Sequence, residues 1–441
     1  MSDSHRFYEI RCPVHGFITI TDWERDIINA PAFQRLRRIR QLAWTDQVYP
    51  GAMHTRFEHS LGVLHVASLI FDGIAARSKD LLQSKLAYDA TGLKRERTLV
   101  RLTSLLHDVG HAPFSHAAEE LFPAINPVDE QRLKTGEFKE DKVNRFKHES
   151  YSAAIIRTEL RDVIENHPLN KNYELKADDV ANLLEGTVQA GRALLWREII
   201  SGQLDADRMD YLIRDSLHVG VDYGKFDWRR LVNSVVLVPW GEDRGLRLGV
   251  EEGGFHAAEG LLLARYFMFT QVYFHKTRVA YNIHLKNALA EMLPGGVFPR
   301  PDGSSPRDYL GWDDWKVLGL LAAGGGGDHG RRLARRDHFR EVYHSPESPK
   351  DEDVDSLVRI RSALGELLKA EEASETSTYK VGHPDIPVKS ANPGGEIKPL
   401  SEHSSVVKGL LHAISLRRFY CQKDDIPEAR NRIAQLKEQV L

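Results

Sequence analysis

Cysteine is nearly absent from this chain, which has two, Cys12 and Cys421, among 441 residues. Two cysteines exclude a disulfide framework and a zinc site built from thiolates, and they favour a reducing compartment. Excess charge is absent too, because 60 basic and 63 acidic residues leave a formal net charge of −3. A near-neutral chain has no overall attraction to nucleic acid, although a local basic groove is compatible with it.

Long hydrophobic runs are also missing. The first ten residues, MSDSHRFYEI, lack the apolar core of a signal peptide. The apolar run from Gly260 to Phe269 contains Arg265 and is too short to cross a bilayer. We therefore expect a cytoplasmic protein that does not interact with membranes. Its 41% apolar and 28% charged residues are ordinary for a globular chain of one or two domains.

Apolar residues recur at helical spacing over most of the chain. Two β-branched segments, 231–238 and 246–250, flank a glycine-containing turn and predict one small β-hairpin. Later in the chain, residues 376–400 are rich in Pro, Gly, Ser and Lys, which predicts a flexible segment. We predict a core of residues 1–294 and an accessory C-terminal lobe of residues 295–441. The predicted helices are 23–42 (broken near Pro31), 60–77, 96–106, 147–160, 180–184, 192–202, 205–218, 256–293, 354–373, 405–419 and a polar helix at the end.

The most distinctive stretch is residues 107–116, HDVGHAPFSH. His107 and Asp108 offer an imidazole nitrogen and a carboxylate oxygen side by side, a natural pair for one cation. His111 and His116 follow at once and are suited to act as acid, base or phosphate partner. A glycine and a proline inside the stretch break a helix. The segment therefore predicts a functional site rather than a core helix.

Two ligands do not hold a metal ion, so others must come from elsewhere in the chain. Two further stretches are rich in His and Asp: HTRFEHSLGV at 54–63 and DADRMDYLIRD at 205–215. Together with HDVGHAPFSH and YFHK at 273–276, they resemble the HD-domain phosphohydrolases, and most closely the deoxynucleoside triphosphate triphosphohydrolases. The resemblance runs from about residue 10 to about residue 290. The family pattern H…HD…D then falls on His59, His107, Asp108 and Asp207.

The resemblance implies hydrolysis of deoxynucleoside triphosphates to the deoxynucleoside and inorganic triphosphate. It assigns one divalent metal ion to His59, His107, Asp108 and Asp207. Two imidazoles and two carboxylates leave open positions for water and a phosphate oxygen. This donor set suits manganese, magnesium, iron or zinc and does not select one of them. The implied fold is mostly α, an HD-domain helical core with a small β-hairpin and a mixed C-terminal lobe.

Four residues form the predicted acid–base group. In the family, the histidines that match His111, His116 and His148 contact phosphate and take part in proton transfer. We expect His116 to protonate the leaving 5′-oxygen. Glu119 follows His116 by one turn and is placed to orient its imidazole. Any one of them alone would be interpreted as a packing or capping residue, so the prediction depends on their combination with the metal pattern.

A triphosphate carries several negative charges, so cations should converge on it. Arg56 lies three residues before His59, on the same face if that turn is helical. Arg208 follows Asp207 at a position where the family usually has lysine. Arg265 and Lys276 complete the predicted clamp, although each cation alone would more often be a surface residue.

Contacts to the sugar are implied by the resemblance alone. Gln41 matches a family position near the sugar, and Tyr211 and Asp215 match residues that meet the deoxyribose. There the carboxylate accepts a hydrogen bond from the 3′-hydroxyl. Tyr273 matches a tyrosine that closes on the sugar, and a tight contact of this kind leaves no room for a 2′-hydroxyl. Tyrosines in such positions are equally compatible with core packing.

Residues 29–37, NAPAFQRLR, resemble a segment that binds an activating guanine nucleotide in the animal enzymes. Gln34 and Arg37 match that segment, whereas Asn29 stands where the family has aspartate. A carboxylate accepts two guanine donors, and an amide does so less well. We therefore expect no guanine-specific activation at this segment, which leaves two alternatives: another nucleotide binds there, or none does.

Two other functions stay open on the sequence. An HD-type 3′–5′ nuclease or phosphodiesterase could use the same groups on single-stranded DNA, although the near-neutral charge disfavours it mildly. A non-catalytic nucleotide sensor would keep the metal ligands but would not need His111, His116 and His148. The resemblance also implies a homodimer or homotetramer.

Overall fold

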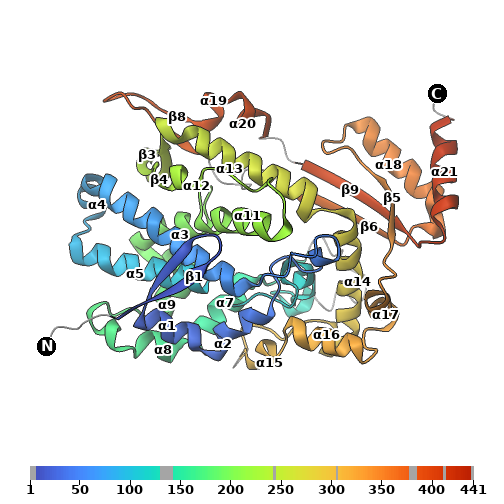
Figure 1. Cartoon of the computed structure of the whole chain (residues 1–441), viewed down its shortest axis with the longest axis horizontal. Coiled ribbons are helices and arrows are strands. Elements are labelled where there is room, and N and C mark those ends of the chain that lie inside the picture. Colours follow the sequence, from blue (N-terminus) through green and yellow to red (C-terminus); the bar gives the residue numbers. More distant parts are fainter. Residues whose placement is uncertain are drawn as a thin grey trace.

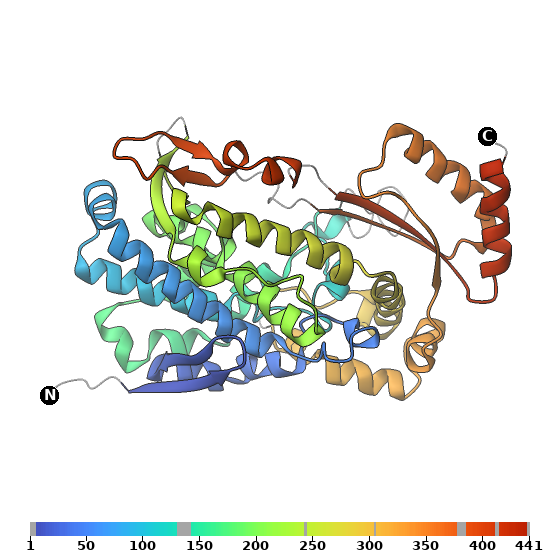
Figure 2. The same cartoon turned by 45° about the horizontal axis from the view of Figure 1, so that its top comes forward.

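The computed structural model describes residues 6–129, 143–241, 245–303, 306–376, 385–410 and 414–438. These residues are mostly helical, with three small sheets (Figure 1). The helices of the first two thirds form the main body, and α18 and α21 lie beyond it at one end of the long axis (Figures 1 and 2). The expectation of a mostly α fold with small β elements is confirmed.

The α-helices of the described residues are α1 (Asp22–Asn29), α2 (Pro31–Gln34), α3 (Arg56–Arg77), α4 (Lys79–Leu86), α5 (Ala90–Leu106), α7 (His148–Arg157), α8 (Arg161–Glu165), α9 (Ala177–Glu185), α10 (Arg197–Ser201), α11 (Ala206–Val219), α12 (Trp228–Val232), α13 (Phe255–Met268), α14 (Lys276–Met292), α15 (Arg307–Leu310), α16 (Asp314–Ala322), α17 (Gly327–Arg335), α18 (Asp351–Leu364), α19 (Leu400–His403), α20 (Ser405–Leu410) and α21 (Ile426–Glu438). The strands are β1 (Phe7–Cys12), β2 (Gly16–Thr21), β3 (Val235–Trp240), β4 (Gly245–Glu251), β5 (Arg340–His344), β6 (Ala370–Thr376), β7 (Pro387–Lys389), β8 (Ile397–Pro399) and β9 (Ile414–Cys421).

Helix α3 is the central helix of the main body and packs against α5 and α11. Thr55 and Glu58 form a capping box that fixes its first turn. By length and composition α3 could cross a membrane, but 67% of its apolar window is buried inside the protein. The apolar residues of α3 therefore form protein core.

The stretch 107–116 follows α5, and its last two residues begin the 3-10 helix η3 (Ser115–Leu121). Phe114 and Ser115 both have a φ of +57°, a left-handed conformation that residues other than glycine rarely adopt. Gly110 lies against α7, where a Cβ atom would be 2.2 Å from the backbone nitrogen of Ser152. Only glycine fits there, so packing against α7 holds the turn in place.

Helix α11 brings the aspartate-rich stretch 205–215 to α3. The Asp205 side chain caps the helix by accepting a hydrogen bond from the backbone N–H of Arg208. The helix ends at Gly220, whose φ of +79° suits a left-handed C-cap. Because α11 packs on α3, Asp207 in its first turn faces His59.

Three sheets are present among the described residues, where the sequence predicted one hairpin. The predicted hairpin exists as β3 and β4, and β7 and β8 extend it into a four-stranded sheet. Strand β7 pairs in parallel with β4, so a segment of the predicted lobe is joined to the core. Strands β1 and β2 form a separate hairpin, and β5, β9 and β6 form an antiparallel sheet beside α18 and α21 (Figure 2).

Two predicted helices of the C-terminal part are wrong in their second halves. The helix predicted at 354–373 ends at Leu364 and is followed by β6, and the one predicted at 405–419 ends at Leu410 and is followed by β9. Strand β9 is the central strand of its sheet, so pairing with two distant segments overrides local helical spacing.

The segment 376–400, expected to be flexible, contains strands β7 and β8. Strand β7 pairs with β4 and β8 pairs with β7, so part of the segment has regular structure, and its flexibility stays a prediction. Residues 377–384 of the segment lie outside the described residues. The division of the chain at residue 294 stays a prediction.

Candidate active site

Four residues from three parts of the chain meet beside the main cavity. His59 comes from α3, His107 and Asp108 follow α5, and Asp207 lies in the first turn of α11. The Nε2 atom of His59 is 3.0 Å from an Asp207 carboxylate oxygen and 3.6 Å from one of Asp108. The Nε2 atom of His107 is 3.2 Å from Asp108 and 3.8 Å from Asp207. The fold thus brings together the four residues predicted to bind a metal ion.

Hydrogen bonds on the far side of each ring determine which nitrogen faces this cluster. The Nδ1 atom of His107 is 2.8 Å from the carbonyl oxygen of Ser104, and Nδ1 of His59 is 2.8 Å from a carboxylate oxygen of Asp210. Both Nδ1 atoms are donors, because each faces an acceptor. The Nε2 atoms therefore face the aspartate carboxylates, an arrangement that a proton or a metal ion between them would stabilise.

The donor set fits a divalent cation. The buried Nε2 atom of His107 has no hydrogen-bond partner among the described residues. Ligand atoms of His59, His107 and Asp207 lie within 4.8 Å of one another. Burial opposes a positive charge on His59, but hydrogen bonds with Asp207 and Asp210 raise its pKa to about 10. The same carboxylates that attract a proton there would attract a metal ion.

Arg56 connects the metal cluster to the turn that follows it. Its guanidinium donates to a carboxylate oxygen of Asp108 at 2.6 Å and to the hydroxyl of Ser115 at 2.9 Å. Burial opposes ionisation of Asp108, but Arg56 and nearby histidines hold its pKa well below the usual range. Arg56 thus keeps this carboxylate ionised and places a positive charge at the cavity wall.

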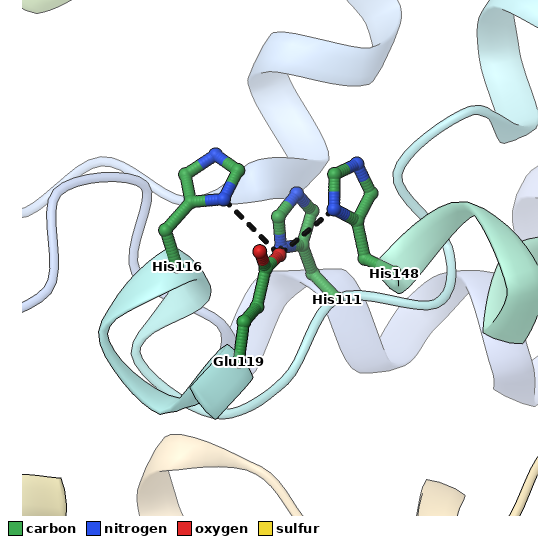
Figure 3. A group of neighbouring side chains, drawn as sticks. All are labelled: His111, His116, Glu119 and His148. Atoms are coloured by element: carbon green, nitrogen blue, oxygen red, sulfur yellow. Dashed lines mark hydrogen bonds and ion pairs between the residues drawn. The ribbon is translucent and has the colours of Figure 1, made fainter. Parts of the chain in front are cut away.

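A second cluster consists of His111, His116, Glu119 and His148 (Figure 3). One carboxylate oxygen of Glu119 is 2.8 Å from Nδ1 of His148, 3.1 Å from Nδ1 of His116 and 3.4 Å from Nδ1 of His111. The rings of His111 and His148 stack with centroids 4.0 Å apart. The four residues of the predicted acid–base group therefore surround one carboxylate.

Charges within this second cluster are unequal. Burial would raise the pKa of Glu119, but His116 and His148 hold it well below the usual range. Burial would lower the pKa of His148, but the Glu119 carboxylate and a neighbouring glutamate raise it to about 9. Burial and nearby positive charges lower the pKa of His111 well below 6.5. Near neutral pH the cluster therefore holds a carboxylate, a charged His148 and a neutral His111.

One cavity of about 600 Å³ joins the two clusters. Its volume suits a small polar ligand. Its walls come mainly from α10, α11, α14 and the turn after α5 with the 3-10 helix η3, and strand β6 contributes Glu372, Ala373 and Ser374. The lining includes six of the predicted substrate-binding residues: Gln41, Arg56, Tyr211, Asp215, Arg265 and Tyr273.

Tyr273 and Asp215 form a hydrogen-bonded pair in the cavity wall. The Tyr273 hydroxyl donates to one carboxylate oxygen of Asp215 at 2.7 Å, and Nε2 of His54 lies 2.8 Å from the other. The ring of Tyr211 meets that of Tyr273 edge-on at 6.1 Å. Two tyrosine rings and a positioned carboxylate thus share one wall of the cavity.

Two predicted cations lie outside the cavity lining. Arg208 follows Asp207 on α11 and turns away from it, and its guanidinium donates to the backbone and side chain of Gln203. Lys276, the first residue of α14, is exposed. Arg278, two residues later, lines the cavity. A helix rotates by about 100° per residue, so a shift of two positions changes which side chain faces the site.

Asn29, Gln34 and Arg37 lie at the end of α1 and in the following short helices, and none of them lines the cavity. The Gln34 amide donates to the backbone oxygen of Ile28 at 2.7 Å, and Arg37 donates to Gln34 at 3.0 Å. Arg37 also lies over the ring of Phe57 at 3.5 Å. A nucleotide site at this segment stays a prediction.

Sequence reasoning missed several residues that position the site. His54 holds Asp215, and Asp210 holds His59. Asp210 lies in the quoted stretch DADRMDYLIRD, and metal-binding histidines commonly donate to a carboxylate. That rule was a signal that could have found Asp210. His15, which contacts Asp210, carries no such signal because it lies 195 residues away.

Paired imidazoles and carboxylates beside acid–base groups in one cavity are the donor pattern of metal-dependent hydrolases. The chain matches the HD domain over residues 56–215 and the HD associated region over residues 226–417. It belongs to the HD-domain family, whose motif the sequence predicted. The metal-binding pattern H…HD…D of that family lies within the first matched region.

Relatives of this chain include proteins with and without an assigned activity. The uncharacterized protein YwfO of Bacillus subtilis is 30% identical over 96% of this chain and 95% of its own length. The deoxynucleoside triphosphate triphosphohydrolase SAMHD1 homolog of Dictyostelium discoideum is 30% identical over 63% of this chain and 48% of its own length. The crystal structure of a hypothetical protein from Aquifex aeolicus has a TM-score of 0.73 and 27% identity, and covers 97% of this chain and 100% of its own.

Proposed function

We propose that this protein hydrolyses deoxynucleoside triphosphates to the deoxynucleoside and inorganic triphosphate, with the help of one divalent metal ion. The observation that carries the proposal is that one cavity is lined by residues of the metal cluster, by the three histidines of the acid–base cluster and by the Tyr273–Asp215 pair. These three features match the phosphorus, the leaving oxygen and the sugar of such a substrate. The similarity to the Dictyostelium triphosphohydrolase supports this substrate class.

His59, His107, Asp108 and Asp207 would hold the metal ion. When bound there, a divalent ion supplies Lewis acidity toward a phosphoryl oxygen and makes water more acidic. The mixed nitrogen and oxygen donors suit manganese, magnesium, iron or zinc. Asp210 and Ser104 hold the far sides of the two rings and keep both Nε2 atoms directed at the ion.

Positive groups of the cavity would bind the triphosphate. Arg56 and Arg265 line the cavity, and His148 adds a positive charge because its pKa is raised to about 9. Guanidinium groups bind phosphate oxygens with paired hydrogen bonds, so both arginines suit this role. The neutral His111 ring lies between Asp108 and Glu119, at 3.2 Å and 3.4 Å, and has one N–H to offer to either carboxylate.

His116 would donate the proton that the leaving 5′-oxygen needs. Its Nδ1 atom faces Glu119 at 3.1 Å, so the carboxylate orients the ring. The His116 side chain is 59% exposed, which leaves its other nitrogen accessible to a substrate in the cavity. General acids of this kind contribute about 10²- to 10⁴-fold to a rate.

Asp215 and Tyr273 would hold the deoxyribose. Asp215 is fixed by His54 and Tyr273, so it presents a carboxylate of fixed orientation to the 3′-hydroxyl. A ring packed against C2′ leaves no room for a 2′-hydroxyl, which selects deoxyribose over ribose.

Product analysis tests this proposal. The purified chain would be incubated with Mn²⁺ or Mg²⁺ and each of the four dNTPs, singly and mixed, and the products separated by ion exchange. We expect a deoxynucleoside and intact triphosphate, and none from an Asp207→Asn variant. Activity confined to mixtures would indicate an activating nucleotide. Degradation of single-stranded DNA without dNTP turnover would favour the nuclease, and binding without turnover the sensor.

A further inference from the structure

A buried carboxylate, Asp210, stands behind the metal cluster. Its side chain is fully buried, and one of its oxygens lies 2.8 Å from Nδ1 of His59. It lies on α11, one turn after Asp207. Asp210 does not line the cavity and is therefore not a substrate contact.

Two further side chains, those of Arg214 and His15, contact Asp210 on its other sides. Arg214, one turn further along α11, donates through Nε to one oxygen and through a terminal nitrogen to the other, both at 2.8 Å. His15 approaches the oxygen that does not face His59, with Nε2 at 2.6 Å. A carboxylate that accepts from two nitrogens of one guanidinium is ionised and only accepts hydrogen bonds, so Nε2 of His15 is a donor.

There is little space for Asp210 to move. A Cβ atom on Gly62 of α3 would lie 1.8 Å from the carboxylate oxygen that His15 contacts. The glycine therefore permits the close approach of α3 to this carboxylate. With contacts from three residues and the α3 backbone beside it, the orientation of Asp210 is set by its surroundings.

His15 reaches this place from the N-terminal hairpin. It lies in the turn between β1 and β2, and its side chain is fully buried although the turn is far from the HD motif in sequence. The ring lies 5.1 Å from His65 and meets Trp228 edge-on at 5.1 Å. Packing against these two rings directs Nε2 at Asp210.

We propose that His15 is a positioning residue of the metal site. It donates to Asp210, Asp210 accepts from Nδ1 of His59, and His59 then presents its Nε2 lone pair to the metal ion. By this inference the N-terminal hairpin, through His15, helps to orient a ligand of the metal site. The inference rests on the proposed metal site and does not depend on which phosphate ester is the substrate.

Mn²⁺ binding to the purified full-length chain, followed by electron paramagnetic resonance without substrate, tests this inference. His15→Leu fills a similar volume without a donor, and His15→Gln restores an N–H near the position of Nε2. Loss of a partner behind a metal ligand commonly weakens metal affinity by about 10- to 100-fold. We expect a loss of this size in His15→Leu and recovery of most of it in His15→Gln.

The control is Ile18→Val on strand β2. Ile18 is fully buried and has no hydrogen-bonding side-chain group, so the change loosens the same hairpin without touching Asp210. Melting of the metal-free variants would be measured in parallel. If His15→Leu binds Mn²⁺ as wild type does, or if Ile18→Val weakens binding as much at an equal loss of melting temperature, the positioning role is overturned. A wild-type chain that binds no divalent ion would overturn both this inference and the metal part of the proposed function.

Discussion

Among single residues, Glu119 determines the charge of the acid–base cluster. Its carboxylate faces three imidazoles, and it raises the pKa of His148 to about 9 against the effect of burial. The pKa of His148 is raised, so its positive charge is present below about pH 9 and is lost as the pH rises through that value. Substrate binding that uses this charge should weaken in the same range.

Replacement of Glu119 by glutamine tests this dependence. The amide keeps the size of the side chain but removes its charge, so the pKa of His148 should fall and His116 should lose its ionic partner. We expect kcat to fall by about 10²-fold, within the range of general acid contributions. We also expect the alkaline rise in KM to begin below pH 9. Steady-state kinetics from pH 6 to 10 measure both, and an unchanged pH profile would contradict the assignment.

A second residue-scale prediction concerns the sugar. Tyr273→Ala removes the ring that we place against C2′, so ribonucleotides should enter more easily. We expect the ratio of kcat/KM for dNTP over NTP to fall by about tenfold or more, the order of effect of one filled or empty group in a pocket. Tyr273→Phe is the matched control, because it keeps the ring and removes only the hydrogen bond to Asp215. Equal ratios in Tyr273→Ala and wild type would exclude the steric role.

The sequence alone predicted the metal ligands, but it did not predict the residues that orient them. His59, His107, Asp108 and Asp207 fall in compact motifs, and the structure places them within contact distance. His15 could not be found this way, because its partner is 195 residues away and only the packing of the hairpin on α11 joins them. Hydrogen bonds between distant segments leave no periodic signal in a sequence.

At the scale of elements, the turn after α5 depends on close packing with α7. A Cβ atom on Gly110 would lie 2.2 Å from the backbone nitrogen of Ser152 and 2.6 Å from the backbone oxygen of His148. Neither backbone atom yields as a flexible side chain does. The position of α7, and with it His148, is therefore tied to a glycine in the HD stretch.

Replacement of Gly110 by alanine should push α7 away from the turn. We expect a loss of stability of about 1–3 kcal/mol, as for other overpacked sites, together with reduced activity. Gly319→Ala is the control, because Gly319 lies in α16 with nothing within 4 Å of the added Cβ. That change should be neutral or stabilise by about 0.5–1 kcal/mol. Urea unfolding would measure the free energy of unfolding of both variants and of wild type. Equal effects of the two substitutions would refute the packing argument.

The ends of helices were predicted well where a capping residue or a glycine marks them. Segments whose structure is decided by pairing with distant strands were predicted poorly. The prediction for α11 began at Asp205, its N-cap, and ended close to Gly220. Strand β9 was predicted as part of a helix, although β5 and β6 pair with it on both sides. Those partners lie tens of residues earlier in the chain, so local periodicity does not report them.

At the scale of the whole molecule, helix α14 lines the cavity and also packs against elements of the C-terminal part. Arg278, Asn282 and Lys286 recur at a spacing of four residues and line the cavity. Strand β6 of the C-terminal part lines the same cavity. The cavity thus draws on both sides of the predicted division at residue 294. Homo-oligomerisation and the cytoplasmic location stay predictions.

On another side of α14, His284 contacts His329 of α17 and Phe339, the residue directly before β5. The backbone N–H of Phe339 donates to Nε2 of His284 at 3.0 Å, so that nitrogen is an acceptor. Nδ1 of His284 therefore carries the proton and donates to Nδ1 of His329 at 2.8 Å. A second proton on His284 would face the Phe339 N–H. Burial and the neighbouring His329 lower the pKa of His284 to about 3.

This arrangement makes the junction sensitive to acid. The pKa of His284 is lowered from about 6.5 in the unfolded chain, so the unfolded state binds more protons between that value and about pH 3. The contribution of the neutral His284 ring to the free energy of unfolding is fully present above pH 6.5 and is lost as the pH falls through this window.

Replacement of His284 by glutamine tests this dependence, because the amide keeps an oxygen that accepts from Phe339 and does not titrate. We expect the unfolding free energy of this variant to fall less between pH 7 and pH 4 than that of wild type, by on the order of 2 kcal/mol. His256→Gln, an exposed histidine on α13, should follow wild type, and parallel curves for all three proteins would show that His284 does not hold the junction.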